Sequence, residues 1–377
     1  MKLSLVSLIA LLALALALVA NSCKNEPPII PEEEFSPKWE SVPMLAGMDI
    51  RYTIQHKGVL YVGAVDERTR LGAVYKTEDA KIWTKVKDVG FDFGAMTFHG
   101  DTLYVIGDSL YRYLPSLGWQ GLFSWGFRSA QAVSDMIFYK GKLYVMLARG
   151  NLRTLQVEMN GNWIALRPFN GTSEGAMSRF CKVNKGDSEV VYVRPYPTAL
   201  VGTIYRFDGE RFIAEPTVGL TGQDYPTMNA MMARGDSLLL GYYYWYSRDM
   251  PAGGLIKSYK DGVFSNFTDS LPLLSLNPQL VQPYSTYPNS FAFYGDRLFV
   301  GTFPIGVVEW IPQTRSWKNI SKGLPTVSPD TTYKDFYASI SFIEAFKGHI
   351  IVGYGHPAFF HWATTRGMYI YRVSDSN

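Results

Sequence analysis

Aromatic and arginine side chains gather in the segments that connect the apolar runs of this chain. Aromatic faces stack on sugar rings and on flat ligands, and Arg supplies directional, charge-assisted hydrogen bonds. Such a set of side chains suits a glycan or a peptide. The ligand-binding candidates are Arg68, Tyr196, Trp245, Tyr246, Arg248, Tyr287, Tyr333, His356, Trp362 and Arg366.

The densest aromatic run is GYYYWYS at 241–247. Tyr242 and Tyr243 continue the apolar run SLLLG, as expected of a strand that is buried on both faces, so we expect them in the core. Trp245 and Tyr246 lead into the polar stretch SRDMPAGG. For these two rings, ligand contact and packing under a loop both stay open.

The chain lacks several signatures of cofactor and metal chemistry. It has no HExxH, no pair of CxxC motifs, no Walker loop and no GxGxxG fingerprint. His349, His356 and His361 lie close in sequence, but one falls in an expected turn and the others flank an apolar loop, so we expect no metal site. The 36 basic and 33 acidic residues are scattered without blocks, which argues against nucleic acid. We expect no cofactor and no nucleotide.

The elements that must position the candidates repeat along the chain. A polar turn followed by an apolar strand occurs seven times. The Gly of each turn supplies the positive φ that a tight hairpin needs. The copies are KGVLYVG at 57, HGDTLYVIG at 99, KGKLYV at 140, KGDSEVVYV at 185, RGDSLLLG at 234, YGDRLFVG at 294 and KGHIIVG at 347.

Each copy continues into a third apolar run, and six of the seven continue into a fourth that carries an aromatic residue, as in KIWTKV at 81–86. The seventh copy stops at Val373 without a fourth run, whereas PKWESV at 37–42 has the fourth-run signature and nothing before it. The pattern predicts an all-β fold, a seven-bladed β-propeller of four-stranded antiparallel blades whose last blade is closed by an N-terminal strand. We assign residues 37–377 to this domain.

The connections between the runs differ in length. The turns between first and second strands are short, whereas the longer segments join second to third strands, as at 65, 194, 244 and 354, or join successive blades, as at 215, 268 and 321. In a propeller these two kinds of connection lie on the same face. Since loops on a rigid scaffold carry most binding sites, we expect the site on that face.

The N-terminus has a different character. Lys2 is followed by eighteen uncharged, Leu/Ala-rich residues, which predicts a signal peptide over 1–22. The stretch ANSC resembles the lipobox of bacterial lipoproteins, which implies lipidation of Cys23. The Pro/Glu-rich segment that follows, over 23–36, is typical of a flexible tether. An ordinary signal peptide and an uncleaved anchor remain open. With Cys23 lipidated, Cys181 has no disulfide partner and is expected to act as a small buried hydrophobic residue.

The repeats resemble the degenerate kelch and Asp-box (sialidase-like) propellers, and together with the N-terminus they resemble the propeller lipoproteins of Gram-negative envelopes. The resemblance rests on the repeat pattern over 37–373 and on TEDAKIW at 77–83, a partial Asp-box. It implies a cell-envelope location with an outer-membrane lipid anchor, facing the periplasm or the cell surface. The resemblance implies the propeller fold but does not imply an activity.

The sequence motifs leave one class of enzyme possible. IRYT at 50–53 weakly resembles the Arg-Ile-Pro motif of sialidases, which makes Arg51 a candidate catalytic residue of a glycoside hydrolase or lyase. Such an enzyme also needs further arginines and a Tyr/Glu pair at the axis.

We therefore expect a non-catalytic binding module that holds a glycan or an envelope protein through its loop-rich face. The alternatives are a sialidase-like hydrolase or lyase, and a scaffold subunit of an envelope complex. A scaffold predicts an exposed apolar patch, for which LPLLSLNPQL at 271–280 is the best candidate.

Overall fold

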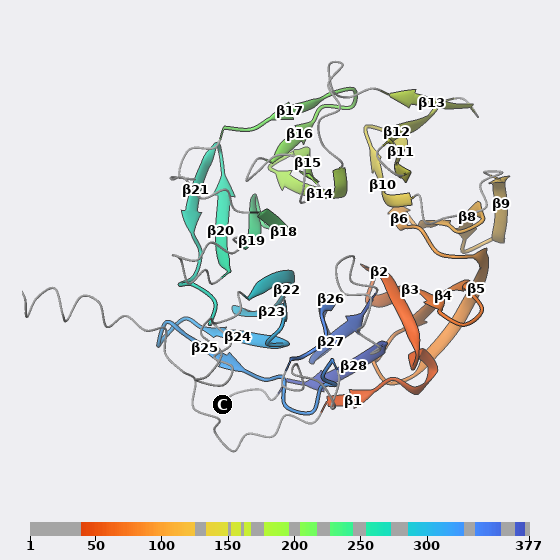
Figure 1. The fold of residues 1–377 in the computed structure, drawn as a ribbon. Coiled ribbons are helices and arrows are strands. Elements are labelled where there is room, and N and C mark those ends of the chain that lie inside the picture. The colour runs from red at the N-terminus through yellow and green to blue at the C-terminus, as the bar shows by residue number, and fades with distance from the viewer. Residues whose placement is uncertain are drawn as a thin grey trace, which may run out of the picture.

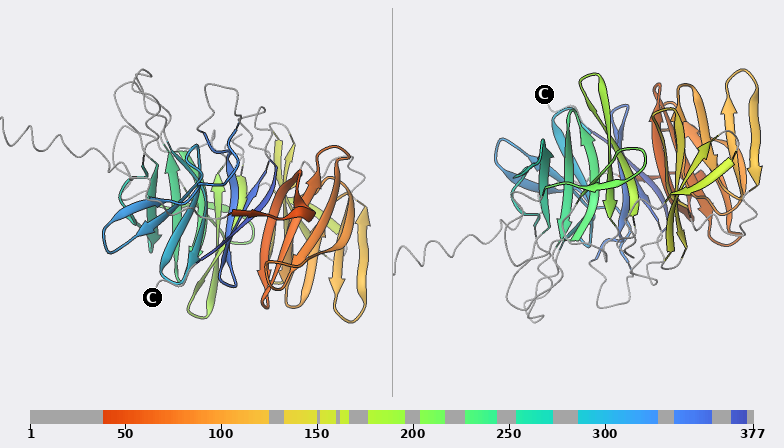
Figure 2. Two further views of the ribbon diagram at one scale, coloured as in Figure 1. Left: turned by 90° about the horizontal axis from the view of Figure 1, so that it is seen from below. Right: turned by 90° about the horizontal axis from the view of Figure 1, so that it is seen from above.

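The computed structural model describes residues 39–124, 133–149, 152–159, 162–166, 177–195, 204–216, 227–243, 254–272, 286–327, 336–355 and 366–373. These residues form seven four-stranded antiparallel sheets arranged around one axis, as the sequence predicts (Figure 1). Seen from the side, the strands run from one face of the ring to the other (Figure 2). The molecule is a seven-bladed β-propeller.

Blades 1 to 6 are simple meanders, blade 7 takes its outermost strand from the start of the domain, and in every blade the first strand of the repeat lies nearest the axis (Figure 1). Blade 1 consists of β2 (Met48–His56), β3 (Val59–Asp66), β4 (Leu71–Thr77) and β5 (Trp83–Phe91). Blade 2 consists of β6 (Met96–His99), β7 (Thr102–Ile106), β8 (Ser109–Leu114) and β9 (Gly118–Ser124). Blade 3 consists of β10 (Val133–Tyr139), β11 (Lys142–Arg149), β12 (Leu152–Met159) and β13 (Asn162–Leu166).

Blade 4 consists of β14 (Met177–Lys185), β15 (Ser188–Pro195), β16 (Tyr205–Phe207) and β17 (Phe212–Ala214). Blade 5 consists of β18 (Thr227–Arg234), β19 (Ser237–Tyr243), β20 (Leu255–Lys260) and β21 (Val263–Asn266). Blade 6 consists of β22 (Tyr287–Tyr294), β23 (Arg297–Phe303), β24 (Val307–Ile311) and β25 (Ser316–Asn319). Blade 7 consists of β26 (Ile340–Phe346), β27 (His349–Tyr354), β28 (Gly367–Arg372) and β1 (Trp39–Ser41).

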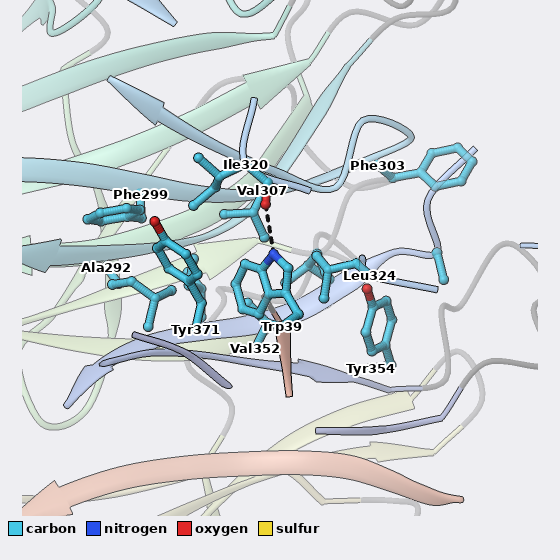
Figure 3. Close-up of a cluster of buried hydrophobic side chains, with 14 of the residues drawn as sticks. Trp39, Ala292, Phe299, Phe303, Val307, Ile320, Leu324, Val352, Tyr354 and Tyr371 are labelled. Carbon is cyan, nitrogen blue, oxygen red and sulfur yellow. Dashed lines mark hydrogen bonds between the residues drawn. The ribbon is translucent and has the colours of Figure 1, made fainter. Parts of the chain in front are cut away.

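The ring closes as the sequence predicts. Strand β1 pairs with β28, so the outermost strand of blade 7 comes from the start of the domain. Trp39 is buried against Tyr371, and its indole Nε1 donates a 2.7 Å hydrogen bond to the carbonyl oxygen of Ile320 in blade 6 (Figure 3). A short 3-10 helix, Pro43–Leu45, then leads into β2. Trp39 therefore ties the N-terminal strand to two blades at once.

The hairpins between the first and second strands all lie on one face, called here the hairpin face. In the Lys-Gly turns both residues have positive φ, as at Lys57 and Gly58, which matches a type I′ turn. In the Gly-Asp turns the first residue, the glycine, has positive φ, as at Gly100. The ends of the second and fourth strands define the opposite face, called here the loop face.

The core lies between the blades. Four second strands carry a glycine at the same register position, in the repeated pattern of VG and LG pairs. A Cβ on Gly353 would overlap the Phe342 ring, and a Cβ on Gly63 would overlap the Phe93 ring. These glycines let aromatic side chains approach the backbone of the sheet.

One expectation about the loops was wrong. The segment at 65–72 is not a long insertion, because β3 extends to Asp66 and β4 begins at Leu71. The Asp66 carboxylate accepts hydrogen bonds from the backbone N–H groups of Arg68 and Thr69, which closes this connection as a compact turn.

The innermost strands share a bulge near the loop face. In six of the seven blades the pairing of first and second strands shifts by one residue at the same place. A bulge bends its strand and redirects a side chain, and such features concentrate at binding sites. The unpaired residues are all polar: Arg51, Ser134, Ser178, Asn229, Asn289 and Ser341.

Candidate functional site

The structure places four of the residues that the sequence singles out: Arg51, Arg68, Tyr287 and Arg366. Three of them lie at the loop-face ends of blades 1 and 7. The candidates Tyr196, Trp245, Tyr246, Arg248, Tyr333, His356 and Trp362 lie outside the described residues, as do the signal peptide at 1–22, the lipidation site Cys23 and the tether at 23–36. Those assignments stay predictions.

Ion pairs hold the two predicted arginines of this region. Arg51, the bulge residue of β2, has its Nη2 at 2.6 Å from Oδ2 of Asp49, which is fully buried. Arg366 precedes β28, and its Nη2 lies 2.7 Å from Oε1 of Glu67 in the neighbouring blade. This pair joins blade 7 to blade 1, and only 9% of the Arg366 side chain is exposed. These ion pairs hold both arginines in place, and their roles in a site stay predictions.

The turn that carries Arg68 is rigid, although Arg68 itself is exposed. Arg70 has positive φ, and its Nη2 forms a 2.7 Å contact with Oδ2 of the fully buried Asp92. The backbone N–H of Asp92 donates to the carbonyl oxygen of Arg70. These bonds fix the end of β5 to the start of β4, so Arg68 projects from a preorganised platform.

An exposed apolar pair lies beside this turn. Leu71 and Phe91 are cross-strand partners in β4 and β5, and they are 55% and 44% exposed. Among the described residues, the other large exposed apolar side chains do not face one another as partners in a sheet. Exposed apolar residues that adjoin an arginine are typical of protein interfaces.

Tyr287, at the start of β22, is packed rather than free. Its ring lies 4.4 Å from that of Tyr243 in an edge-on contact and 6.0 Å from that of Phe303 in a stacked one. Burial raises the pKa of its phenol. Tyr242 and Tyr243 are themselves buried, which confirms the assignment of this half of the GYYYWYS run to the core.

A second polar group, which the sequence did not single out, lies at the axis. Tyr52 of blade 1 donates a 2.7 Å hydrogen bond from its hydroxyl to Oδ1 of Asp135 in blade 3. The bond spans blade 2, whose innermost strand, β6, runs from Met96 to His99. The buried Asp135 also accepts backbone N–H bonds from Met136 and Phe180.

Glu344 of blade 7 and Arg179 of blade 4 complete this axial group. The Glu344 carboxylate accepts hydrogen bonds from Thr53 Oγ1 at 2.8 Å and Gln55 Nε2 at 2.9 Å. The guanidinium of Arg179 lies 5.8 Å from the centre of the Tyr52 ring, and its positive charge acts on both Asp135 and Glu344. The axial group thus gathers side chains from blades 1, 3, 4 and 7.

Burial dominates the electrostatics of this group. It raises the pKa of the Asp135 and Glu344 carboxyls, while their hydrogen-bond donors and Arg179 oppose the shift. Burial and the Asp135 charge raise the pKa of the Tyr52 phenol well above its usual range. Burial also raises the pKa of the free Cys181 thiol to about 12, so this cysteine is unreactive. A phenol held in this way is a poor nucleophile.

Neutral polar groups extend along the axis at the level of the bulges. The side-chain amide of Asn229 donates to Asn289 Oδ1, and Asn289 Nδ2 donates to Ser339 Oγ at 2.8 Å. Arg194 donates from Nη1 to the carbonyl oxygen of Asn229. This chain of bonds crosses blades 4 to 7 and fixes the amides in place.

Sequence reasoning missed the axial group because its members stand inside apolar strands. One signal was present: a charged residue interrupts the innermost runs SDMIFY, SRFCKV and FIEAF. A charge in a strand that packs on both faces requires a buried partner or a ligand. The sequence also contains GTSEG at 171–175, with the spacing of the serine-hydrolase elbow. It falls between β13 and β14, outside the described residues, whereas the elbow of serine hydrolases joins a strand to a helix.

Within the described ranges, no group of three His, Cys, Asp or Glu side chains is placed to hold a metal ion. No helix in the same part of the chain is long and apolar enough to cross a membrane.

Solved structures share the fold. YCF48 bound to D1 peptide matches with a TM-score of 0.55 at 11% identity, over 92% of this chain and 98% of that one. Drosophila Plexin A in complex with Semaphorin 1b matches with a TM-score of 0.54 at 9% identity, over 90% and 87%. No protein-family model matches the sequence, and no curated protein matches it. At these identities the similarity shows the propeller fold alone.

Proposed function

We propose that this protein is a non-catalytic binding module that holds a protein partner on the loop face of its propeller. The observation that carries the proposal is the exposed Leu71 and Phe91 pair beside Arg68, on a turn that Asp66 and the Arg70–Asp92 ion pair hold rigid. Aromatic and arginine side chains on a preorganised surface are the usual anchors of protein interfaces.

Two solved propellers of similar fold support a protein partner, since one is bound to a peptide and the other is in complex with a protein. The lipobox-like ANSC adds the expectation that a lipid on Cys23 holds the propeller at the cell envelope, on the outer membrane. A partner in the same compartment then meets the loop face without crossing a membrane.

The experiment compares two tagged full chains, one with Phe91→Ser and one with Ile82→Ser. Both changes remove an exposed apolar side chain: Phe91 lies at the loop face, and Ile82, 71% exposed, lies next to a hairpin-face turn. We expect Phe91→Ser to reduce the recovery of a discrete partner from envelope extract by about tenfold or more, and Ile82→Ser to leave it unchanged. Equal recovery by both variants would contradict the proposal.

Two parallel assays address the alternatives. Saturable binding on a glycan array, without a protein partner, would replace the protein by a carbohydrate ligand. Turnover of a fluorogenic sialoside that is abolished by Arg51→Ala would establish the glycoside hydrolase. The described part of the chain gives the hydrolase little support, because Arg51 is paired with Asp49 and a single arginine, Arg179, reaches the axial tyrosine.

A further inference from the structure

Arg179 occupies an unusual position for an arginine. It is the first paired residue after the bulge of β14, an innermost strand, and it is nevertheless exposed to solvent. Within the described ranges, no carboxylate forms an ion pair with its guanidinium. Its described contact is with the Tyr52 ring, at 5.8 Å from guanidinium carbon to ring centre.

The two nearby carboxylates are already satisfied by other donors. Asp135 accepts hydrogen bonds from the Tyr52 hydroxyl and from the backbone N–H groups of Met136 and Phe180. Glu344 accepts hydrogen bonds from Thr53 and Gln55. Among the described residues, the five N–H donors of Arg179 therefore remain available to a molecule that enters along the axis.

The chemistry of the surroundings selects the ligand. A guanidinium presents a planar fork of donors, which matches a carboxylate in a bidentate arrangement. A dianionic phosphate is disfavoured here, because two acids, the buried Asp135 and the partly buried Glu344, lie close enough to interact with the charge of Arg179. The Tyr52 ring adds an aromatic surface against which a flat group packs.

We propose that Arg179 and Tyr52 form an axial site for a carboxylate attached to a flat or apolar group. Arg179 binds the carboxylate, and Tyr52 is held in place for the attached group by its bond to Asp135. The site is separate from the Leu71 and Phe91 surface. Evidence for or against this site therefore does not decide whether a partner binds the loop face.

The test uses three probes of nearly equal shape: benzoate, its neutral amide benzamide, and the cation benzylamine. Binding to the full chain in detergent is followed by saturation-transfer NMR at millimolar probe concentration. We expect saturable binding of benzoate, weakened about tenfold or more in Arg179→Met, and no comparable binding of benzamide or benzylamine. Arg179→Lys is expected to retain part of the affinity, because the charge remains while the fork is lost.

Arg372→Met is the matched control, since Arg372 is exposed on the outer half of blade 7. Thermal unfolding of each variant shows that the propeller is intact, and Arg179→Lys keeps the test decisive if Arg179→Met does not fold. Absence of benzoate binding, or equal binding to wild type and Arg179→Met, would overturn the site. Preferential binding of benzylamine that is lost in Glu344→Gln would show a cation site instead. In each of these outcomes the recovery of a loop-face partner still decides the proposed function separately.

Discussion

At the scale of single residues, the Tyr52–Asp135 bond joins two non-adjacent blades. The two residues are 83 positions apart, and the hydroxyl supplies one of three donors to a buried carboxylate. Tyr52→Phe removes that donor and leaves the buried Asp135 carboxylate with one hydrogen bond fewer. We expect a loss of about 1 to 3 kcal/mol in the free energy of unfolding, measured by urea denaturation. Tyr61→Phe, on a partly buried ring of the same blade, serves as the control and should change stability much less.

The Glu344 carboxyl at the axis predicts a pH dependence of stability with a definite sign. Burial raises the pKa of the Glu344 carboxyl in the folded state, so the folded protein binds this proton more tightly than the unfolded chain does. The stabilisation from this group is fully present below the unfolded pKa and is lost as the pH rises through the folded pKa. Glu344→Gln removes that dependence.

We therefore expect Glu344→Gln to gain stability relative to wild type as the pH rises from below the unfolded pKa of a glutamate, about 4.3, toward neutrality. The comparison of variant and wild type at each pH cancels the opposite trend from exposed acids such as Asp79 and Asp101, whose pKa values are lowered by their hydrogen bonds. Glu40→Gln, at an exposed site, is the control. A constant difference across the pH range would show that Glu344 does not titrate in this window.

At the scale of elements, the glycines of the second strands set the distance between blades. Gly353→Ala would drive a Cβ into the Phe342 ring and should destabilise the protein by about 1 to 3 kcal/mol. Gly121 in β9 is the matched control, because a Cβ there meets nothing within 4 Å. Its change to Ala should be close to neutral in the same denaturation assay. Equal effects at both positions would argue against tight blade packing at Gly353.

The sequence predicts these elements well because each strand carries its own signal. The Lys-Gly and Gly-Asp turns located the hairpins, and the unmatched run PKWESV located the closing strand. The connection at 65–72 was misjudged because its length in residues did not reveal that Asp66 folds it into a compact turn. Local sequence patterns thus predict the positions of strands and turns more reliably than they predict the shape of a loop.

The axial group could not be predicted in the same way. Tyr52, Asp135, Arg179 and Glu344 come from four blades, and the first three directly follow the bulges of their strands. A sequence pattern marks each as a polar residue in a buried strand, but it does not say which partners it meets. For Arg51 and Arg366, likewise, the sequence did not reveal the ion pairs that they form with Asp49 and Glu67.

At the scale of the whole molecule, ring closure depends on Trp39. Its ring packs on Tyr371, and its indole is bonded to Ile320 in the neighbouring blade (Figure 3). Trp39→Ala should cost about 3 to 5 kcal/mol and should open the ring between blades 6 and 7 first. Hydrogen exchange is expected to increase in β28 before it increases in β10 or β14. A uniform increase across all blades would show that closure is not a separate step.

The central claim concerns which face of the ring holds a partner. The most direct measurement places the photoreactive residue benzoylphenylalanine at position 68 on the loop face or at position 82 beside the hairpin face, in the full chain expressed in its native cells. Both positions are exposed and belong to blade 1, so the two chains differ chiefly in the face that is probed. A discrete protein adduct from position 68, absent from position 82 and abolished by Phe91→Ser, is the predicted result. Adducts of equal yield from both positions, or an adduct from position 82 alone, would contradict a partner on the loop face.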